Sequence, residues 1–315
     1  MSSVQNKWLW WLIARSKCCI RCKKEIIPHH YKRSNHYVWI DRRLYDLLCS
    51  TCMSNIPWIT TVQCPRCGRA QVCQDCHYRR TSSLRCNRSA VKYTDEMKQW
   101  LGTYKFQGDA RYRELIAYML SHVYEQVTLQ LVRDQGLYEH WQNSRLTIRT
   151  YAKRYHLWHA VTAVPISEER MLERGFNQAE QLALGVAEYS NLPFIELLHR
   201  KRDGVKLSSK NKRERQNSVQ QLYVSEASYW LALMRVLQTT RSIPTSVQPI
   251  INQQRHASNQ VSGQVTSEAP SRTSINILLV DDVYTTGSTI EACSSALVEC
   301  APSDVTIYSL TWARA

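Results

Sequence analysis

The most constraining feature of this sequence is a series of four Cys-x-x-Cys pairs within its first 76 residues. Two residues between cysteines let a tight turn direct both sulfur atoms at one metal ion, and two such pairs complete a tetrahedral thiolate site. The sequence therefore predicts two structural zinc sites in an N-terminal double zinc-ribbon module. The paired cysteines are Cys19 and Cys22, Cys49 and Cys52, Cys64 and Cys67, and Cys73 and Cys76.

The ligand sets of these sites have alternatives. A disulfide framework is disfavoured, because no secretory signal is recognisable and cytosolic thiols stay reduced. Sequential pairing would put the first two pairs in one site and the last two in the other, whereas an interleaved cross-brace would mix them. The loop from Lys23 to Leu48 is long for one ribbon. Nearby histidines that can replace a cysteine are His29, His30 and His77.

The same region carries most of the net charge. The whole chain has 41 Lys and Arg against 26 Asp and Glu, a formal +15, and residues 1–92 hold 17 of the basic residues but only four of the acidic ones. Tryptophan and tyrosine residues are interleaved with these charges. Basic side chains bind phosphates and aromatic rings stack on unpaired bases, so this pattern favours binding of single-stranded DNA. The alternative is that the aromatic residues form the core of a small zinc module.

The apolar pattern indicates a protein without a membrane span. The longest apolar run, Trp8 to Ala14, has seven residues and is far too short to cross a bilayer. Basic residues and a cysteine pair follow it, where a signal peptide would have a small-residue cleavage site. We therefore expect a cytoplasmic protein. With 43% apolar residues over 315 positions, the chain can bury a sizeable core, which excludes disorder throughout.

Beyond the cysteine-rich region, strand and helix patterns alternate. Residues 93–135 have apolar side chains at helical spacing, which predicts packing helices. A short buried strand over His159–Pro165 precedes a helix over Asn177–Tyr189. A second strand over Asn276–Val283 precedes a helix that extends to about Glu299. Repeated strand-loop-helix units predict an α/β fold with a parallel sheet flanked by helices.

We expect two domains. Residues 1–92 form the basic zinc-ribbon module, and residues 93–315 form the α/β domain, which a last strand over Val305–Thr311 completes. Residues 239–274 are rich in Ser, Thr, Gln and Pro and contain no aromatic residue, which predicts a flexible insertion.

The chemistry of the second domain is concentrated in the loop after the strand over Asn276–Val283. Asp281 and Asp282 stand at the carboxyl end of this strand, where open α/β sheets bind ligands. Hydroxyl groups, a glycine and a helix start follow, and together they suit a phosphate monoester. The carboxylates would repel a phosphate but accept hydrogen bonds from ribose hydroxyls, with or without a divalent metal ion, so the loop predicts a ribose 5-phosphate site. Its phosphate-binding residues are Thr285, Thr286, Gly287, Ser288 and Thr289.

This loop resembles the diphosphoribosyl-binding signature of type I phosphoribosyltransferases, in which two acids after a strand precede Thr-Gly-Ser/Thr-Thr. Other segments narrow the resemblance to the ComF family of competence-associated proteins, which join an N-terminal zinc ribbon to a phosphoribosyltransferase-like domain. These segments are Ala163-Val164-Pro165-Ile166-Ser167 with Arg170, Glu173 to Glu180, and Lys105 to Asp109. The resemblance covers nearly the whole chain outside residues 230–274.

The resemblance implies a pentosyl-transferring glycosyltransferase that binds 5-phosphoribosyl 1-diphosphate with Mg²⁺. Asp281 and Asp282 would be its catalytic carboxylates. The loop after Val164-Pro165 would bind pyrophosphate, with Arg170 and Arg174 as its cations. The resemblance also implies a role in DNA uptake and transformation, with DNA-uptake or recombination proteins as partners. The acceptor of the phosphoribosyl group is not readable.

One stretch departs from the family pattern. Lys206-Leu207-Ser208-Ser209 stands where the family has a Thr and a Gln ahead of a basic motif. The surrounding stretch from Arg200 to Arg215 carries eight Lys and Arg against two acids, which fits either a basic hood over the site or a solvated loop.

Two rival functions remain open at this point. The first is a non-catalytic, zinc-containing factor that binds single-stranded DNA in transformation or DNA utilization and does not turn over the ribose ligand. The second, a zinc-ribbon transcription factor, would explain only the N-terminal half of the chain.

Overall fold

The computed structural model describes residues 18–27, 42–71, 73–74, 76, 82–107, 109–201, 222–240, 275–302 and 304–315. Several predictions concern residues outside this range: the apolar run from Trp8 to Ala14, the three histidines proposed as alternative ligands, residues 202–215 of the basic stretch, and residues 241–274 of the insertion. In the part of the chain that is described, no helix is both long and apolar enough to cross a membrane.

Four parallel strands form the central sheet, in the order β1 (Leu84–Lys92), β6 (Val305–Arg314), β5 (Ile275–Tyr284) and β2 (Ala160–Ala163). Strand β5 is almost continuously buried, as expected for an apolar strand covered on both faces. The predicted α/β fold with a parallel sheet is therefore confirmed. Strands β5 and β6 both extend beyond their predicted ends, and β2 is shorter than predicted.

The register of the sheet brings the ends of three strands to one edge. Ala163 of β2 pairs with Val280 of β5, and Val280 pairs with Leu310 of β6. In parallel strands these residues all precede the carboxyl ends, so the loops that follow them lie at the same edge. Asp281 and Asp282 come directly after Val280 and thus stand at this edge.

Strand β1 lies in the sheet, although the predicted domain boundary places it in the N-terminal module. Residues up to 92 were expected in the N-terminal module, but β1 pairs with β6 along its length and belongs to the sheet. Its polar residues hide this role in the sequence. Asn87, Arg88 and Ser89 are buried because they hydrogen-bond to backbone and side-chain partners, which satisfies groups that a surface strand would expose to water. The division into two domains remains a prediction.

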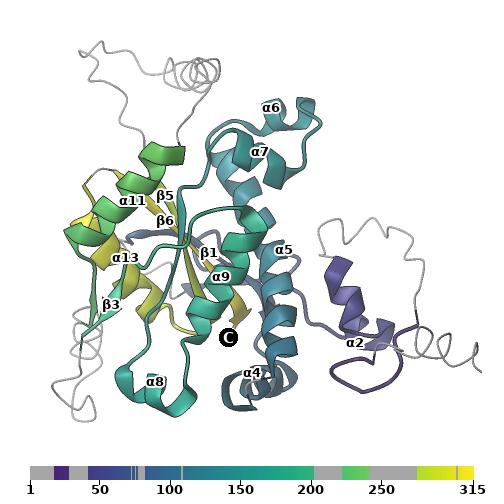
Figure 1. Cartoon of the computed structure of the whole chain (residues 1–315). Helices are drawn as coiled ribbons and strands as arrows, with labels where there is room; N and C mark the ends of the chain where they lie inside the picture. Colours follow the sequence, from purple (N-terminus) through teal and green to yellow (C-terminus); the bar gives the residue numbers. More distant parts are fainter. Residues whose placement is uncertain are drawn as a thin grey trace, which may run out of the picture.

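Helices cover both faces of the sheet. Helices α5 (Ala110–Asp134) and α9 (Gln178–Ser190) pack on one face, and α13 (Ser288–Cys300) packs on the other (Figure 1). The predicted helices over Asn177–Tyr189 and up to about Glu299 are confirmed. The other described helices are η1 (Arg42–Asp46), α2 (Ser50–Ser54), α4 (Asp95–Gln107), α6 (Tyr138–Asn143), α7 (Ile148–Arg154), α8 (Glu168–Arg174) and α11 (Ala227–Thr240).

Two smaller features frame the site. A two-stranded antiparallel sheet joins β3 (His199–Arg200) to β4 (Tyr223–Val224), and β4 packs against α13. The turn that carries Cys64 and Cys67 lies against β1. A Cβ atom on Gly68, which has a φ of +74°, would lie 2.6 Å from the Asn87 carbonyl oxygen, so only glycine allows this approach.

Candidate functional site

The centre of the candidate site is the carboxylate pair at the end of β5. The Oδ1 atom of Asp281 accepts a hydrogen bond of 2.8 Å from the backbone N–H of Asp282. Burial, followed by repulsion from the Asp282 carboxylate, raises the pKa of Asp281 to about 8. The Asp281 carboxylate therefore stands where negative charge is costly, which is common at ligand-binding and catalytic sites.

Lys105, from the last turn of α4, forms an ion pair with Asp282. Both side chains are largely buried, at 18% and 15% exposure, so this pair is held more firmly than an exposed one. In the sequence Lys105 contributes only to the family resemblance, and it is not among the predicted site residues. Its nearness to Asp282 joins two segments that are far apart in the chain, which no local pattern reveals.

The hydroxyl loop, residues Thr285–Thr289, follows the carboxylates directly. Thr285 and Thr286 are exposed, and the hydroxyl groups of Thr286 and Ser288 lie 2.9 Å apart. Gly287 has a φ of +81°, and a Cβ atom there would clash with the side chain of Tyr284 beneath the loop. The loop therefore needs glycine to curl over Tyr284 and to present the first N–H groups of α13, which suits an anionic group.

The two predicted cations come from helix α8 and differ in their surroundings. Arg170 is exposed, and its positive charge acts on Asp281, so α8 lies near the carboxylate pair. Arg174 is half-buried. Its guanidinium lies over the ring of Phe106, 5.5 Å from the centroid, and donates to Gln178 Oε1 at 2.8 Å. The Nε atom of Arg174 is buried and has no hydrogen-bond partner within the described residues, which leaves a donor available for an anion.

Tyr223 is a further site residue that the sequence analysis missed. Its side chain hydrogen-bonds with that of Thr289, the last residue of the hydroxyl loop. Burial, with smaller contributions from the nearby Cys293 and Asp281, raises the pKa of Tyr223 to about 12. The residue comes from the two-residue strand β4, which is too short to show a strand pattern.

Arg314, near the end of β6, supports the hydroxyl loop from below. Its Nη1 atom donates to the carbonyl oxygens of Tyr284 at 3.0 Å and Thr285 at 2.7 Å, and its guanidinium lies 4.7 Å from the Tyr284 ring centroid. Its Nη2 atom lies 3.7 Å from the Sγ atom of Cys67. One buried side chain thus joins the loop to the second cysteine group.

The eight predicted metal ligands form two separate groups. The first contains Cys19, Cys22, Cys49 and Cys52, and the second contains Cys64, Cys67, Cys73 and Cys76. Within each group the sulfur atoms all lie within 4.8 Å of one another. The sequential pairing is therefore observed, and the interleaved cross-brace is not.

The donor set of both groups fits zinc. In the first group burial opposes ionisation of Cys19, but backbone N–H groups of Cys22 and Cys49 lower its pKa to about 7. Burial and the neighbouring thiols raise the pKa of Cys52 well above its usual value. Four crowded sulfur atoms thus resist full ionisation by themselves, and a divalent cation relieves this repulsion. Both groups can hold zinc ions.

Fold and site together define a class of protein. It is an α/β protein with a carboxylate pair and a hydroxyl loop at the sheet edge, and two four-cysteine groups precede this region in the chain. No family model matches the chain. It is 30% identical over 264 residues to the competence protein ComFC of Bacillus subtilis (strain 168). The aligned region covers 81% of this chain and 79% of that protein. It is 26% identical over 267 residues to the competence protein ComFC of Streptococcus pneumoniae (strain ATCC BAA-255 / R6), covering 84% and 86%. The chain belongs to the ComF family.

Proposed function

We propose that the chain binds 5-phosphoribosyl 1-diphosphate with Mg²⁺ at the Asp281 and Asp282 pair and the hydroxyl loop, and that it acts on single-stranded DNA during competence. The observation that carries the first part is the placement of two carboxylates and a hydroxyl loop at the carboxyl edge of a parallel sheet, facing cationic side chains from α4 and α8. The two similar proteins, both named for competence, support the second part.

Each group in the site has a distinct task in this proposal. The hydroxyl loop and the first N–H groups of α13 bind the 5-phosphate. Asp281 and Asp282 accept hydrogen bonds from the ribose hydroxyls, while Lys105 keeps Asp282 oriented. Arg170 and Arg174 bind the pyrophosphate, and the buried Nε atom of Arg174, which has no hydrogen-bond partner among the described residues, can donate to it.

The site suits a divalent cation. Two adjacent carboxyl groups offer oxygen atoms, which are the ligands that Mg²⁺ prefers, and a bound cation would favour the ionised form of Asp281, whose pKa burial raises. Bound Mg²⁺ would neutralise charge on the pyrophosphate group. Asp281 and Asp282 are the residues that would hold it.

Transfer of the phosphoribosyl group to an acceptor is the second candidate function. The observation that favours it is the position of the α8 arginines, because cations beside the pyrophosphate would stabilise it as a leaving group. Release of pyrophosphate on addition of an acceptor base would demonstrate transfer. Binding without release over a panel of bases would leave the protein as a ligand-binding factor.

Calorimetric titration of Mg²⁺ and 5-phosphoribosyl 1-diphosphate into the full chain tests ligand binding. We expect binding by the wild-type protein and its loss in the variant with Asp281→Asn and Asp282→Asn. The matched control carries Glu299→Gln and Asp304→Asn, which remove the same charge from exposed positions outside the loop. Equal binding by all three proteins would overturn the site assignment.

We also propose one zinc ion in each four-cysteine group. Elemental analysis of purified protein should give about two zinc ions per chain. Values near one would mean that one group does not hold metal.

DNA binding is tested by titrating a labelled single strand at several salt concentrations. Because each phosphate contact releases a counterion, affinity should fall steeply as salt rises. Absent or salt-insensitive binding would remove this part of the proposal.

A further inference from the structure

A groove lies apart from the Asp281 site, and its lining includes no residue of the hydroxyl loop. Its volume is about 1110 Å³, slightly above the range of roughly 300–1,000 Å³ that small-molecule sites occupy. One wall comes from η1, which lies in the chain between the two cysteine pairs of the first group, and the other comes from α5, α7 and α9. The groove thus joins the cysteine-rich region to the helices that cover the sheet.

The lining of this groove is rich in arginine. Five arginines face three glutamates, and all five are exposed. Glu125 is buried and accepts a hydrogen bond from the Tyr189 hydroxyl, so only Glu114 and Glu188 offer exposed negative charge. The groove therefore has an excess of positive charge at its surface. The arginines are Arg42, Arg43, Arg113, Arg145 and Arg149.

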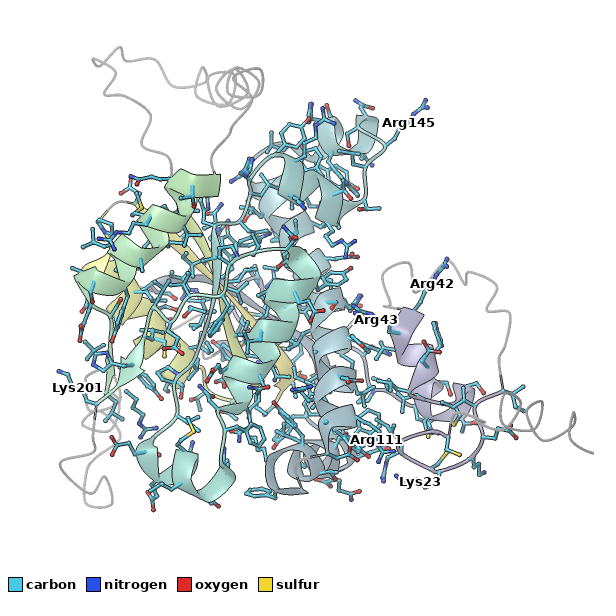
Figure 2. All side chains as sticks on the ribbon, in the orientation of Figure 1. Lys23, Arg42, Arg43, Arg111, Arg145 and Lys201 are labelled. Carbon is cyan, nitrogen blue, oxygen red and sulfur yellow. The ribbon has the colours of Figure 1, made fainter. Side chains whose placement is uncertain are left out.

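The arginines come from both sides of the groove. In Figure 2, Arg43 extends from η1 toward α5, and Arg42 extends from the same helix toward the region below Arg145. Within the described part of the chain, the side chains of Arg42 and Arg145 take part in no hydrogen bond or ion pair. Cations that face one another across a groove suit a ligand with a repeating negative charge.

Two aromatic side chains accompany this charge. The Arg43 guanidinium lies 4.1 Å from the ring centroid of Tyr118, and the Arg149 guanidinium lies 4.7 Å from that of Tyr189. Each pair forms a flat, cationic surface in the lining of the groove. Such surfaces stack on unpaired bases, and a basic groove with aromatic side chains is the usual arrangement for binding single strands.

We propose that this groove is the binding site for single-stranded DNA, with backbone phosphates at Arg42, Arg113 and Arg145 and bases stacked at Tyr118 and Tyr189. The inference rests on the proposed DNA-binding function and assigns it a location. It places the strand between the cysteine-rich region and the α/β region, rather than on the cysteine-rich module or the Arg200 to Arg215 stretch alone.

The test compares two triple variants of the full chain by fluorescence anisotropy with a labelled oligothymidine. The groove variant carries Arg42→Gln, Arg113→Gln and Arg145→Gln. The control carries Arg133→Gln, Arg154→Gln and Arg235→Gln, three exposed arginines that do not line the groove. Both variants lose the same charge, so a difference in their DNA affinity depends on where the three arginines lie. Zinc content and far-UV circular dichroism establish that both are folded.

We expect the groove variant to bind at least tenfold more weakly, and the control to bind within about twofold of wild type. The dependence of log K on log salt should become shallower by about 2 in the groove variant, since each phosphate contact on a single strand contributes about 0.7. Photo-crosslinking with an oligonucleotide that contains 5-iododeoxyuridine should label peptides that contain Tyr118 or Tyr189.

Two outcomes would overturn the inference, and they are distinguishable. If the wild-type chain binds DNA and the groove variant binds equally well, the groove is not the site although DNA binding stands. Crosslinks confined to residues 1–27 or 200–215 would have the same meaning. If the wild-type chain binds no DNA at any salt concentration, the proposed DNA-binding function falls together with the groove.

Discussion

The two four-cysteine groups have the same ligands but are attached to the rest of the molecule in different ways. The first group reaches α4 through Arg21, whose side chain contacts Glu96 at 3.4 Å and Gln99 at 3.2 Å in partly exposed positions. The second group is tied to the sheet by buried contacts, including Arg314 to Cys67 and Asn87 to the Cys67 carbonyl oxygen.

This difference indicates that the two groups support different parts of the molecule. Arg314 donates to two carbonyl oxygens at the start of the hydroxyl loop, so the second group supports the proposed ligand site. The first group instead supports η1, because the backbone N–H of Ile20 donates to the Leu47 carbonyl just after η1. Helix η1 carries Arg42 and Arg43 of the groove. We therefore expect that losing the second group impairs ligand binding, and that losing the first impairs DNA binding.

The largest effect is expected from removing each group in turn. Cys64→Ser with Cys67→Ser should lower Tm by roughly 10 °C and abolish binding of 5-phosphoribosyl 1-diphosphate, because a structural metal site contributes directly to folding. Cys19→Ser with Cys22→Ser should weaken DNA binding and leave the ligand affinity within about threefold. Calorimetry and anisotropy on both variants make the comparison. Loss of both activities in both variants would mean that the groups are not separable.

Arg314→Gln removes the contact between the second group and the hydroxyl loop more selectively. The variant retains the eight cysteines of the two groups but loses the hydrogen bonds to Tyr284 and Thr285. We expect about tenfold weaker ligand binding, because the carbonyl oxygens of Tyr284 and Thr285 lose a charged donor. Zinc content should remain at two ions per chain. Arg314→Lys keeps the charge without the planar fork, and it should be intermediate. If both variants bind the ligand with wild-type affinity, Arg314 does not support the hydroxyl loop in the way proposed.

Ionisation of the Asp281 carboxyl should lower the folding stability of the protein. Because its pKa is raised in the folded protein, folding favours the protonated form, and the stability that this proton provides is lost as the pH rises from about 4 through about 8. Asp281→Asn should therefore raise Tm by a few degrees above pH 8 and flatten its decline over that window. Thermal melts of both proteins from pH 5 to pH 9 provide the measurement. An equal or lower Tm above pH 8 would mean that the carboxylate is not strained.

The smallest effect is expected at the contact of the first group with α4. Arg21→Gln removes a partly exposed ion pair, and such pairs contribute about 0–1 kcal/mol. Tm should change by at most about 2 °C, with unchanged affinity for 5-phosphoribosyl 1-diphosphate. A large loss of ligand affinity in this variant would show that the first group also supports the site and would remove the contrast.

The sequence predicted the parts of the molecule that depend on local patterns. The cysteine spacing identified both metal-ligand groups, and the apolar run before Asp281 identified the central strand, because a buried parallel strand needs continuous apolar residues. The hydroxyl loop followed from residue types alone. These features are encoded in short, contiguous segments.

Other features depend on tertiary packing and could not be predicted. Strand β1 is hidden by buried polar residues such as Asn87, whose partners are far away in the sequence. The contacts of Lys105 with Asp282 and of Tyr223 with Thr289 each join distant segments. The groove forms only where η1 meets the helices that cover the sheet, so its arginines appear scattered along the chain.

Hydrogen–deuterium exchange of the wild-type chain with and without Mg²⁺ and 5-phosphoribosyl 1-diphosphate tests the central claim most directly. We predict that the ligand slows exchange in residues 281–291 and 166–176, which contain the hydroxyl loop and the two α8 arginines. Exchange at the groove residues 113–118 should stay unchanged. Protection confined to the groove, or none near Asp281 at saturating ligand, would contradict the account.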